Sequence, residues 1–295
     1  MLSNRLTLPA TALAPAIWGT TYVVTTELLP PDRPLLAALL RSLPAGLLLV
    51  AISRQLPRGS WWWRAAVLGV LNIGVFFALL FVAAYRLPGG LAAIFGAVQP
   101  LLVAGLATGL LGNRLTPRTV IAATAGVAGV ALLVLRADAR LDAVGVAAAL
   151  GGAGVMASGV VLSKKWGAPA PLLAVTGWQL VAGGLLLLPV TLLVEGSPPT
   201  VLTGENIAGY VYLSLLGTAT AYALWFRGIR TLPATSVALL GLLSPVVAAT
   251  AGWLLLDQGL TPGQLFGAAI VLAALIAGQG RNPGQSASTE AAGAH

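Results

Sequence analysis

The chain has 295 residues, of which 58% are hydrophobic and 8% charged, and its mean hydropathy is +0.92. These values exclude an ordinary soluble domain and indicate an all-α polytopic membrane protein. The net charge of +8 does not indicate nucleic-acid binding, because the basic residues are scattered in short runs between apolar segments. The absence of cysteine excludes disulfides and thiolate chemistry.

Ten apolar segments are predicted to cross the membrane as helices. In chain order they cover residues 8–26, 35–52, 65–85, 90–111, 120–135, 144–163, 172–194, 207–226, 234–256 and 265–277. Five segments precede the charged loop at 136–142, and five follow it. The last residues, 281–295, are small and polar and are predicted to form a disordered tail.

The fourth and ninth segments are copies of one another. Residues 87–117 align without a gap on residues 232–262, a shift of 145, and both stretches begin with Leu-Pro and end with Leu-Thr-Pro. Such a long internal period indicates a duplication. We therefore predict two five-helix repeats, residues 1–139 and 140–280. Because each has an odd number of spans, the second repeat must be inverted relative to the first.

Each copy also has one central proline, Pro100 or Pro245. Proline removes a backbone donor and is expected to kink the helix. In a membrane such a break is tolerated only beside protein or a water-filled cavity. The two residues are therefore predicted to be kinks that take part in gating; a kink that serves packing alone is the alternative.

Charged residues predict the orientation. Most arginines and lysines fall in loops on the side of the N-terminus, and most acids fall on the other side. The positive-inside rule then places both termini in the cytoplasm. The three tryptophans at 61–63 lie next to Arg64 and indicate an interfacial belt at the inner face rather than a binding site.

The pattern resembles that of a known family. Trp18-Gly19-Thr20 in the first segment, Arg41 in the second, and the two repeated prolines resemble EamA-type members of the drug/metabolite transporter superfamily. The resemblance covers the chain to about residue 280 and implies a multi-pass carrier. Aromatic residues within the spans make the aromatic amino-acid exporters of the bacterial inner membrane look most similar. Gly112 departs from the family, because many relatives carry an acid there.

Inverted repeats commonly enclose a binding site near the bilayer midplane. Aromatic and polar residues inside the spans are the candidates for binding substrate: Trp18, Thr21, Tyr22, Arg41, Asn72, Phe76, Gln99, Trp178, Gln179, Thr218, Tyr222 and Ser244. Several of them recur at helical spacing on one face of the first and eighth segments. Such a face either lines a cavity or joins helices through hydroxyl groups.

Arg41 is the one ionisable residue well inside a predicted span. A charge at such a depth is costly and is a functional hypothesis by default. Three interpretations stay open: Arg41 binds a substrate carboxylate, bridges backbone carbonyls where helices break, or extends to the outer surface. Its equivalent in the second repeat is Trp178.

The composition of these candidates favours neutral or zwitterionic solutes, because phosphate groups normally need several cations. We predict an exporter of aromatic and other neutral amino acids or similar metabolites. Broad drug and metabolite efflux, a channel, or a structural membrane protein are the alternatives. An enzyme is not expected, because the only histidine is His295 and no two acids share a span. No cofactor or metal is expected; the partners are the substrate and the bilayer, with a weak homodimer suggested by small-residue spacings such as Gly263 with Gly267.

Overall fold

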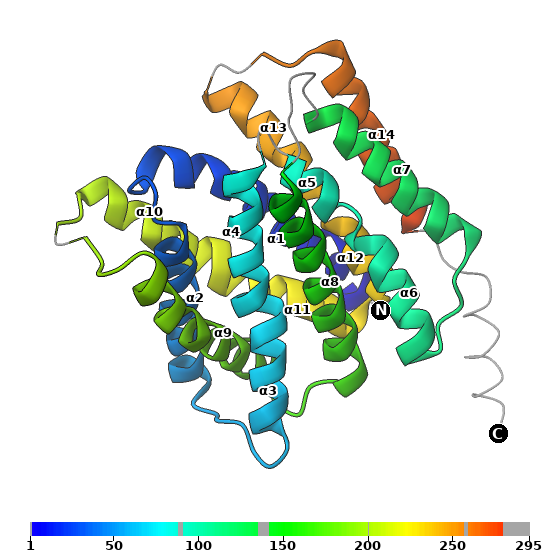
Figure 1. Ribbon diagram of the computed structural model, residues 1–295. Helices are drawn as coiled ribbons and strands as arrows, with labels where there is room; N and C mark the ends of the chain where they lie inside the picture. Colours follow the sequence, from blue (N-terminus) through cyan, green and yellow to red (C-terminus); the bar gives the residue numbers. More distant parts are fainter. Residues whose placement is uncertain (1, 88–90, 135–141, 200, 257–258, 280–295) are drawn as a thin grey trace, which may run out of the picture.

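The computed structural model describes residues 2–87, 91–134, 142–199, 201–256 and 259–279, and every regular element in these ranges is helical (Figure 1). The elements are α1 (Leu2–Leu28), α2 (Pro34–Ser53), α3 (Trp61–Gly69), η1 (Val70–Gly74), α4 (Val75–Arg86), α5 (Leu91–Gly96), α6 (Gln99–Leu111), α7 (Pro117–Val134), α8 (Ala143–Trp166), α9 (Leu172–Val194), α10 (Gly204–Ser214), η2 (Leu215–Thr220), α11 (Ala221–Thr231), α12 (Ala234–Leu240), α13 (Leu243–Leu255) and α14 (Pro262–Gly278). The predicted disordered tail, residues 281–295, lies outside the described residues.

These helices correspond to the predicted spans. In the described ranges, eight helices or runs of consecutive helices are long and apolar enough to cross a membrane, and α14 is a shorter apolar helix. α1 is 27 residues long but contains two prolines. The chain is therefore an all-α multi-pass membrane protein, as predicted. The bounds of α9 are those predicted, because Pro171 precedes the apolar run and Glu195 ends it.

Two of the spans contain a turn of π-helix. η1 joins α3 to α4, and η2 joins α10 to α11. A shift of η1 by the 145-residue period of the repeat places it on residues 215–219, inside η2. π turns change which backbone groups bond to one another and occur frequently at functional sites. The sequence did not predict them.

The two spans with repeated prolines are broken rather than kinked. α5 and α6 are separated at residues 97–98, and α12 and α13 at residues 241–242. Pro100 and Pro245 lie in the first turns of α6 and α13. The backbone N–H groups of a first turn have no partner within the helix, so proline costs little there. The predicted mid-helix kink is thus corrected to the start of a new helix, while the gating role stays a prediction.

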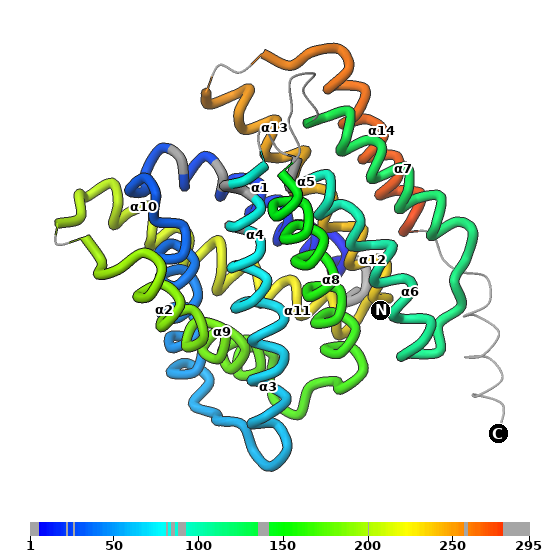
Figure 2. Tube along the Cα trace, viewed as in Figure 1, coloured from blue at the N-terminus to red at the C-terminus, as the bar shows by residue number. Residues whose placement is uncertain are grey.

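The most extensive contacts join equivalent helices of the two halves, α2 with α9 and α7 with α14 (Figure 2). Glycines allow both approaches. A Cβ atom on Gly46 would lie 2.6 Å from the backbone nitrogen of Val181, and one on Gly267 would lie 2.7 Å from the carbonyl oxygen of Gly129. Close backbone packing of this kind holds helices together where lipid provides no hydrophobic drive. Gly267, one of the two glycines that suggested a homodimer, thus packs against α7 of the same chain.

Glu195 fixes the start of α2 to the end of α9. Its carboxylate oxygens accept hydrogen bonds from the backbone N–H groups of Leu35 at 2.5 Å and Leu36 at 2.9 Å. Arg33 Nη1 donates to the carbonyl oxygens of Glu195 at 2.7 Å and Ser197 at 2.9 Å. The carboxylate satisfies two N–H groups of the first helical turn and complements the helix dipole.

We expect Glu195→Gln to lower the free energy of unfolding by about 1–2 kcal/mol, because the neutral amide offers one acceptor where the carboxylate offers two. Equilibrium unfolding in mixed detergent micelles measures the change. Glu205→Gln removes an exposed acid from the first turn of α10 and serves as the control. Equal losses in the two variants would show that the contact of Glu195 with α2 contributes nothing specific.

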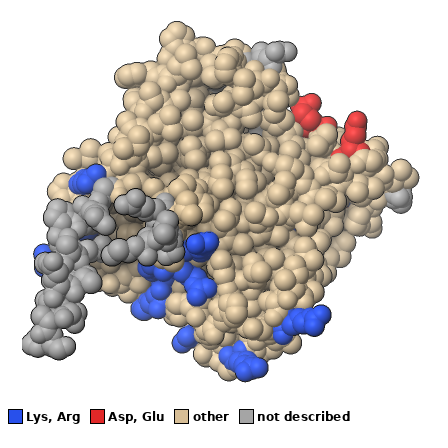
Figure 3. Space-filling model, turned by 180° about the vertical axis from the view of Figure 1, so that it is seen from behind, with Lys and Arg blue, Asp and Glu red and all other residues tan. Residues whose placement is uncertain are grey.

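The charged side chains separate towards two ends of the molecule (Figure 3). The acidic end holds the α1–α2 and α9–α10 connections and the described acids, which are Glu27, Asp32, Asp142, Glu195 and Glu205. The basic end holds the α2–α3, α6–α7 and α8–α9 connections and most of the described cations, which are Arg54, Arg58, Arg64, Arg114, Arg118, Lys164, Lys165, Arg227 and Arg230. Arg33 and Arg86 are the described exceptions at the acidic end.

Candidate substrate pathway

Arg41 is buried in the bundle, seven residues or about 10 Å along α2 from the acidic end. Its Nε donates to the hydroxyl oxygen of Thr218 at 3.0 Å, and its Nη2 donates to the carbonyl oxygen of Gly217 at 3.0 Å. The guanidinium carbon lies 4.9 Å from the centre of the Phe77 ring. No described residue accepts a hydrogen bond from Nη1. One edge of the guanidinium is thus held by η2, and the other has no protein acceptor.

The π turn explains how a helix can offer a carbonyl to this buried cation. In a regular α-helix the backbone N–H of Ala221 would bond to the carbonyl oxygen of Gly217. Here it bonds to the carbonyl oxygens of Leu216 and Thr218 instead. The Gly217 oxygen instead accepts hydrogen bonds from Arg41 and from Trp18 Nε1, the latter at 3.0 Å. Neutral dipoles fixed in this way stabilise a cation in a low-dielectric interior.

Aromatic rings pack together beside the guanidinium, which Phe77 contacts directly. Trp18, Phe77, Tyr222, Trp225 and Phe226 form what we call the central aromatic cluster. The ring centre of Trp18 lies 5.0 Å from that of Tyr222 and 5.1 Å from that of Trp225. The ring centre of Tyr222 lies 6.3 Å from that of Phe77 and 5.8 Å from that of Phe226. Tyr222 and Trp225 are each 1% exposed, whereas Trp18 is half-buried. Trp225 Nε1 is buried without a hydrogen-bond partner.

Other predicted residues lie around this cluster in different ways. The Thr21 hydroxyl donates to the carbonyl oxygen of Trp18 in its own helix at 2.6 Å. Phe76 stacks at 5.7 Å from Phe77 and is half-buried. Gln99 and Ser244 are half-buried beside the breaks that precede α6 and α13. The side chain of Tyr22 lies outside the described residues.

A second polar group of side chains lies at η1, which is the equivalent of η2. Asn72 occupies the position that corresponds to Gly217 after the 145-residue shift. Its Nδ2 donates to Gln179 Oε1 at 2.8 Å and to Ser163 Oγ at 3.3 Å. Asn72 is fully buried, and its Oδ1 has no hydrogen-bond partner. Each π turn therefore carries a polar contact, one towards α2 and the other towards α8 and α9.

The EamA-like transporter family matches this chain twice, at residues 6–135 and 143–277. The chain belongs to the EamA-like transporter family. It is therefore a membrane transporter of small molecules and not an enzyme. Both matched ranges include one π turn and one broken helix, so the family accounts for the whole described bundle.

Several relatives share this family. The chain is 49% identical to protein PecM of Dickeya dadantii over 89% of each chain, and 31% identical to a WAT1-related chloroplastic protein of Arabidopsis thaliana over 88% of this chain and 66% of the other. It is 27% identical to the transporter YvbV of Bacillus subtilis over 88% and 87%. A protein of known crystal structure superimposes with a TM-score of 0.78 at 21% identity, over 94% of this chain and 96% of the other, and shows the shared fold.

Trp178 lies apart from the central aromatic cluster of this EamA-like transporter. Its Nε1 donates to the carbonyl oxygen of Gln55 at 2.7 Å, in the connection between α2 and α3. Its ring packs 6.4 Å from that of Trp61 at the basic end. Trp62 and Trp63, by contrast, are 58% and 52% exposed at the basic end, as the predicted interfacial belt requires.

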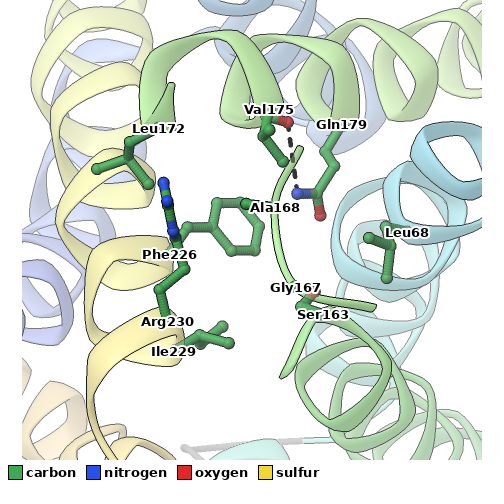
Figure 4. Close-up of a pocket in the computed structure, with 10 residues that line it drawn as sticks. All are labelled: Leu68, Ser163, Gly167, Ala168, Leu172, Val175, Gln179, Phe226, Ile229 and Arg230. Carbon is green, nitrogen blue, oxygen red and sulfur yellow. Dashed lines mark hydrogen bonds between the residues drawn. The ribbon is translucent and has the colours of Figure 1, made fainter. Parts of the chain in front are cut away.

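A small cavity lies between α3, α8, α9 and α11, towards the basic end of the transporter (Figure 4). Its volume is about 20 Å³. Ser163 and Gln179 lie on one side, Phe226 points inwards from α11, and Arg230 stands beside it. Phe226 also belongs to the central aromatic cluster, so the cavity adjoins the region around Arg41.

Sequence reasoning missed several of the residues that meet here. Phe226 was not among the predicted contacts, although it lies four residues after Tyr222 on the same helical face. Trp225 could be predicted, because it lies on the same helical face as Thr218 and Tyr222. Ser163 gave no signal, because a serine near a helix end is common in any membrane protein.

Proposed function

We propose that this transporter exports aromatic and other neutral amino acids, or similar small metabolites, by alternating access. The two inverted repeats, residues 1–139 and 140–280, would expose a shared central site to each side of the membrane in turn. The basic end with both termini would face the cytoplasm of the bacterial inner membrane, in keeping with the positive-inside rule.

The buried guanidinium of Arg41 inside the central aromatic cluster is the observation that carries the proposal. Within the described ranges no residue accepts a hydrogen bond from Nη1, so this nitrogen can donate to a substrate carboxylate. The faces of Trp18 and Tyr222 suit an ammonium group through cation–π contact and an aromatic or apolar side chain through stacking. Trp225 Nε1 offers one further donor. This set of groups matches the two charges and the apolar part of a neutral amino acid.

Symmetry in the packing supports the alternating-access part of the proposal. α4 packs on α8 as α11 packs on α1, and α6 packs on α8 as α13 packs on α1. The same contacts thus recur when the two halves are exchanged. Two arrangements related by this exchange have similar packing and lie close in energy, which is what a carrier that opens to alternate sides requires.

Other solute classes fit less well. A phosphate needs several cations for tight binding, and the described central cluster contains one guanidinium. A lipophilic cation would meet that guanidinium without a buried carboxylate to balance it. The acids of the described ranges lie at the acidic end of the bundle. These charges favour a carboxylate-bearing zwitterion over both.

Counterflow in proteoliposomes tests the proposal. Liposomes that contain the purified protein and are loaded with unlabelled phenylalanine or leucine should accumulate the labelled amino acid in a saturable way, while liposomes without protein should not. Accumulation should persist without a pH gradient, because no acid or histidine lies inside the predicted spans. Exchange of tetraphenylphosphonium instead would favour broad efflux, and a conductance without counterflow would indicate a channel; either result contradicts amino-acid export.

A further inference from the structure

The cavity between α3, α8, α9 and α11 has a basic mouth. Arg230 is exposed at its edge. Lys164 lies at the same end, where its Nζ donates to the carbonyl oxygens of Arg230 at 3.1 Å and Leu232 at 2.9 Å. The described acids lie at the opposite end of the molecule. Two cations without a nearby acid produce a positive potential, which attracts anionic groups and repels cations.

The inner part of the cavity is polar but uncharged. Ser163 Oγ and the Gln179 amide line it, and both bond to the amide of Asn72 behind them. The Oδ1 of Asn72 is buried without a partner. That oxygen faces Gly159 of α8 and not the cavity, so the acceptors at the cavity are the Ser163 hydroxyl oxygen and the Gln179 amide oxygen. An ammonium group would find these oxygen acceptors here, and the Leu68, Ile229 and Phe226 side chains form the apolar part of the lining.

We propose that this cavity is a cytoplasmic subsite for the zwitterionic solute. The subsite binds the solute carboxylate at Arg230 and its ammonium at Gln179 and Ser163 before the solute moves past Phe226 to the central aromatic cluster. The inference rests on the proposed export function and adds a second, separate point of selection. This subsite would favour solutes that carry a carboxylate over organic cations.

Lys164 controls the width of the subsite. At about 20 Å³ the cavity has room for a single water, so a solute is admitted only when the ends of α8 and α11 separate. The two hydrogen bonds of Lys164 hold those ends together. Phe226, which is 4% exposed, separates the cavity from Tyr222 in the same conformation. The structure thus represents the subsite in its closed form.

The absence of native cysteine allows a direct test. Ser163→Cys places one thiol in the cavity, and Ser60→Cys places one at an exposed position of the same end. Both should react with a membrane-impermeant maleimide in inside-out vesicles. At a phenylalanine concentration ten times KM, the labelling rate of Ser163→Cys should fall about tenfold, as expected from occupancy, and that of Ser60→Cys should not change.

A pair of charge variants tests the carboxylate contact. Arg230→Gln should raise the KM for phenylalanine uptake into inside-out vesicles about tenfold, the value of one charge-assisted hydrogen bond. Arg227→Gln removes an exposed cation from the same helix outside the cavity and should leave KM unchanged. Gln179→Leu should raise KM as well, and its folding is checked by thermal stability in detergent.

The outcomes separate the subsite from the export function. Wild-type protein that exchanges no amino acid would overturn both. Normal exchange by the wild type, together with labelling of Ser163→Cys that phenylalanine does not slow, would overturn the subsite alone. Equal KM values for Arg230→Gln and Arg227→Gln would do the same. Protection of Ser163→Cys and a KM effect confined to Arg230→Gln and Gln179→Leu support it.

Discussion

Arg41→Met should fold as stably as the parent protein, but its amino-acid transport should fall about 10- to 100-fold. This is the loss expected when one charge-assisted hydrogen bond to a substrate carboxylate is removed. Burying a guanidinium is costly, and replacing a buried charge by an apolar side chain of similar length is often neutral or stabilising. The Gly217 oxygen keeps its bond from Trp18 in the variant. We therefore expect Arg41 to serve binding of the solute rather than stability.

Counterflow of labelled phenylalanine and the thermal midpoint in detergent measure these two effects separately. Arg58→Met changes an exposed arginine at the basic end and is the control for the loss of one charge. The transport rate of Arg41→Lys should lie between the rates of Arg41→Met and the parent protein. An ammonium cannot bond Thr218, Gly217 and a carboxylate with the geometry of a guanidinium. A lower midpoint in Arg41→Met that Arg41→Lys restores, with transport following stability, would assign Arg41 a purely structural role.

The spans could be predicted because hydrophobic length and proline or charged ends are local signals. α9 shows this, since its apolar run is continuous from Leu172 to Val194. The π turns could not be predicted in the same way. Residues 70–74 and 215–220 contain no feature that distinguishes them from α-helix, and their backbone is positioned by side chains from other helices, such as Trp18 and Arg41 at Gly217.

The site could be predicted in part for a related reason. Periodicity placed Trp18 on one helical face and Thr218 with Tyr222 on another, and in the structure these two faces lie against each other around Gly217. It could not show that Arg41 and Trp178 lie far apart. They are equivalent positions in the two halves, but Arg41 follows the acidic end of α2, whereas Trp178 bonds to Gln55 at the basic end. Two residues that the predicted repeat aligns thus lie towards opposite ends of the bundle.

Gly159→Ala should be strongly destabilising, with a loss of unfolding free energy of about 1–3 kcal/mol, the usual cost of overpacking. An alanine Cβ at this position in α8 would overlap Oδ1 of Asn72. The amide would have to move, and its bonds to Gln179 and Ser163 would weaken with it. Since Gln179 and Ser163 line the cavity at the basic end, we expect transport to fall together with stability.

The same helix supplies a matched control. A Cβ on Gly154 would meet open space, so Gly154→Ala should be neutral or slightly stabilising through helix propensity. Shortening the partner should relieve the clash: the double variant Gly159→Ala with Asn72→Ser should be more stable than the sum of the two single changes predicts, which a double-mutant cycle measures directly. Strict additivity, or equal losses from Gly154→Ala and Gly159→Ala in detergent unfolding, would show that contact between α8 and the π turn does not position the Asn72 amide.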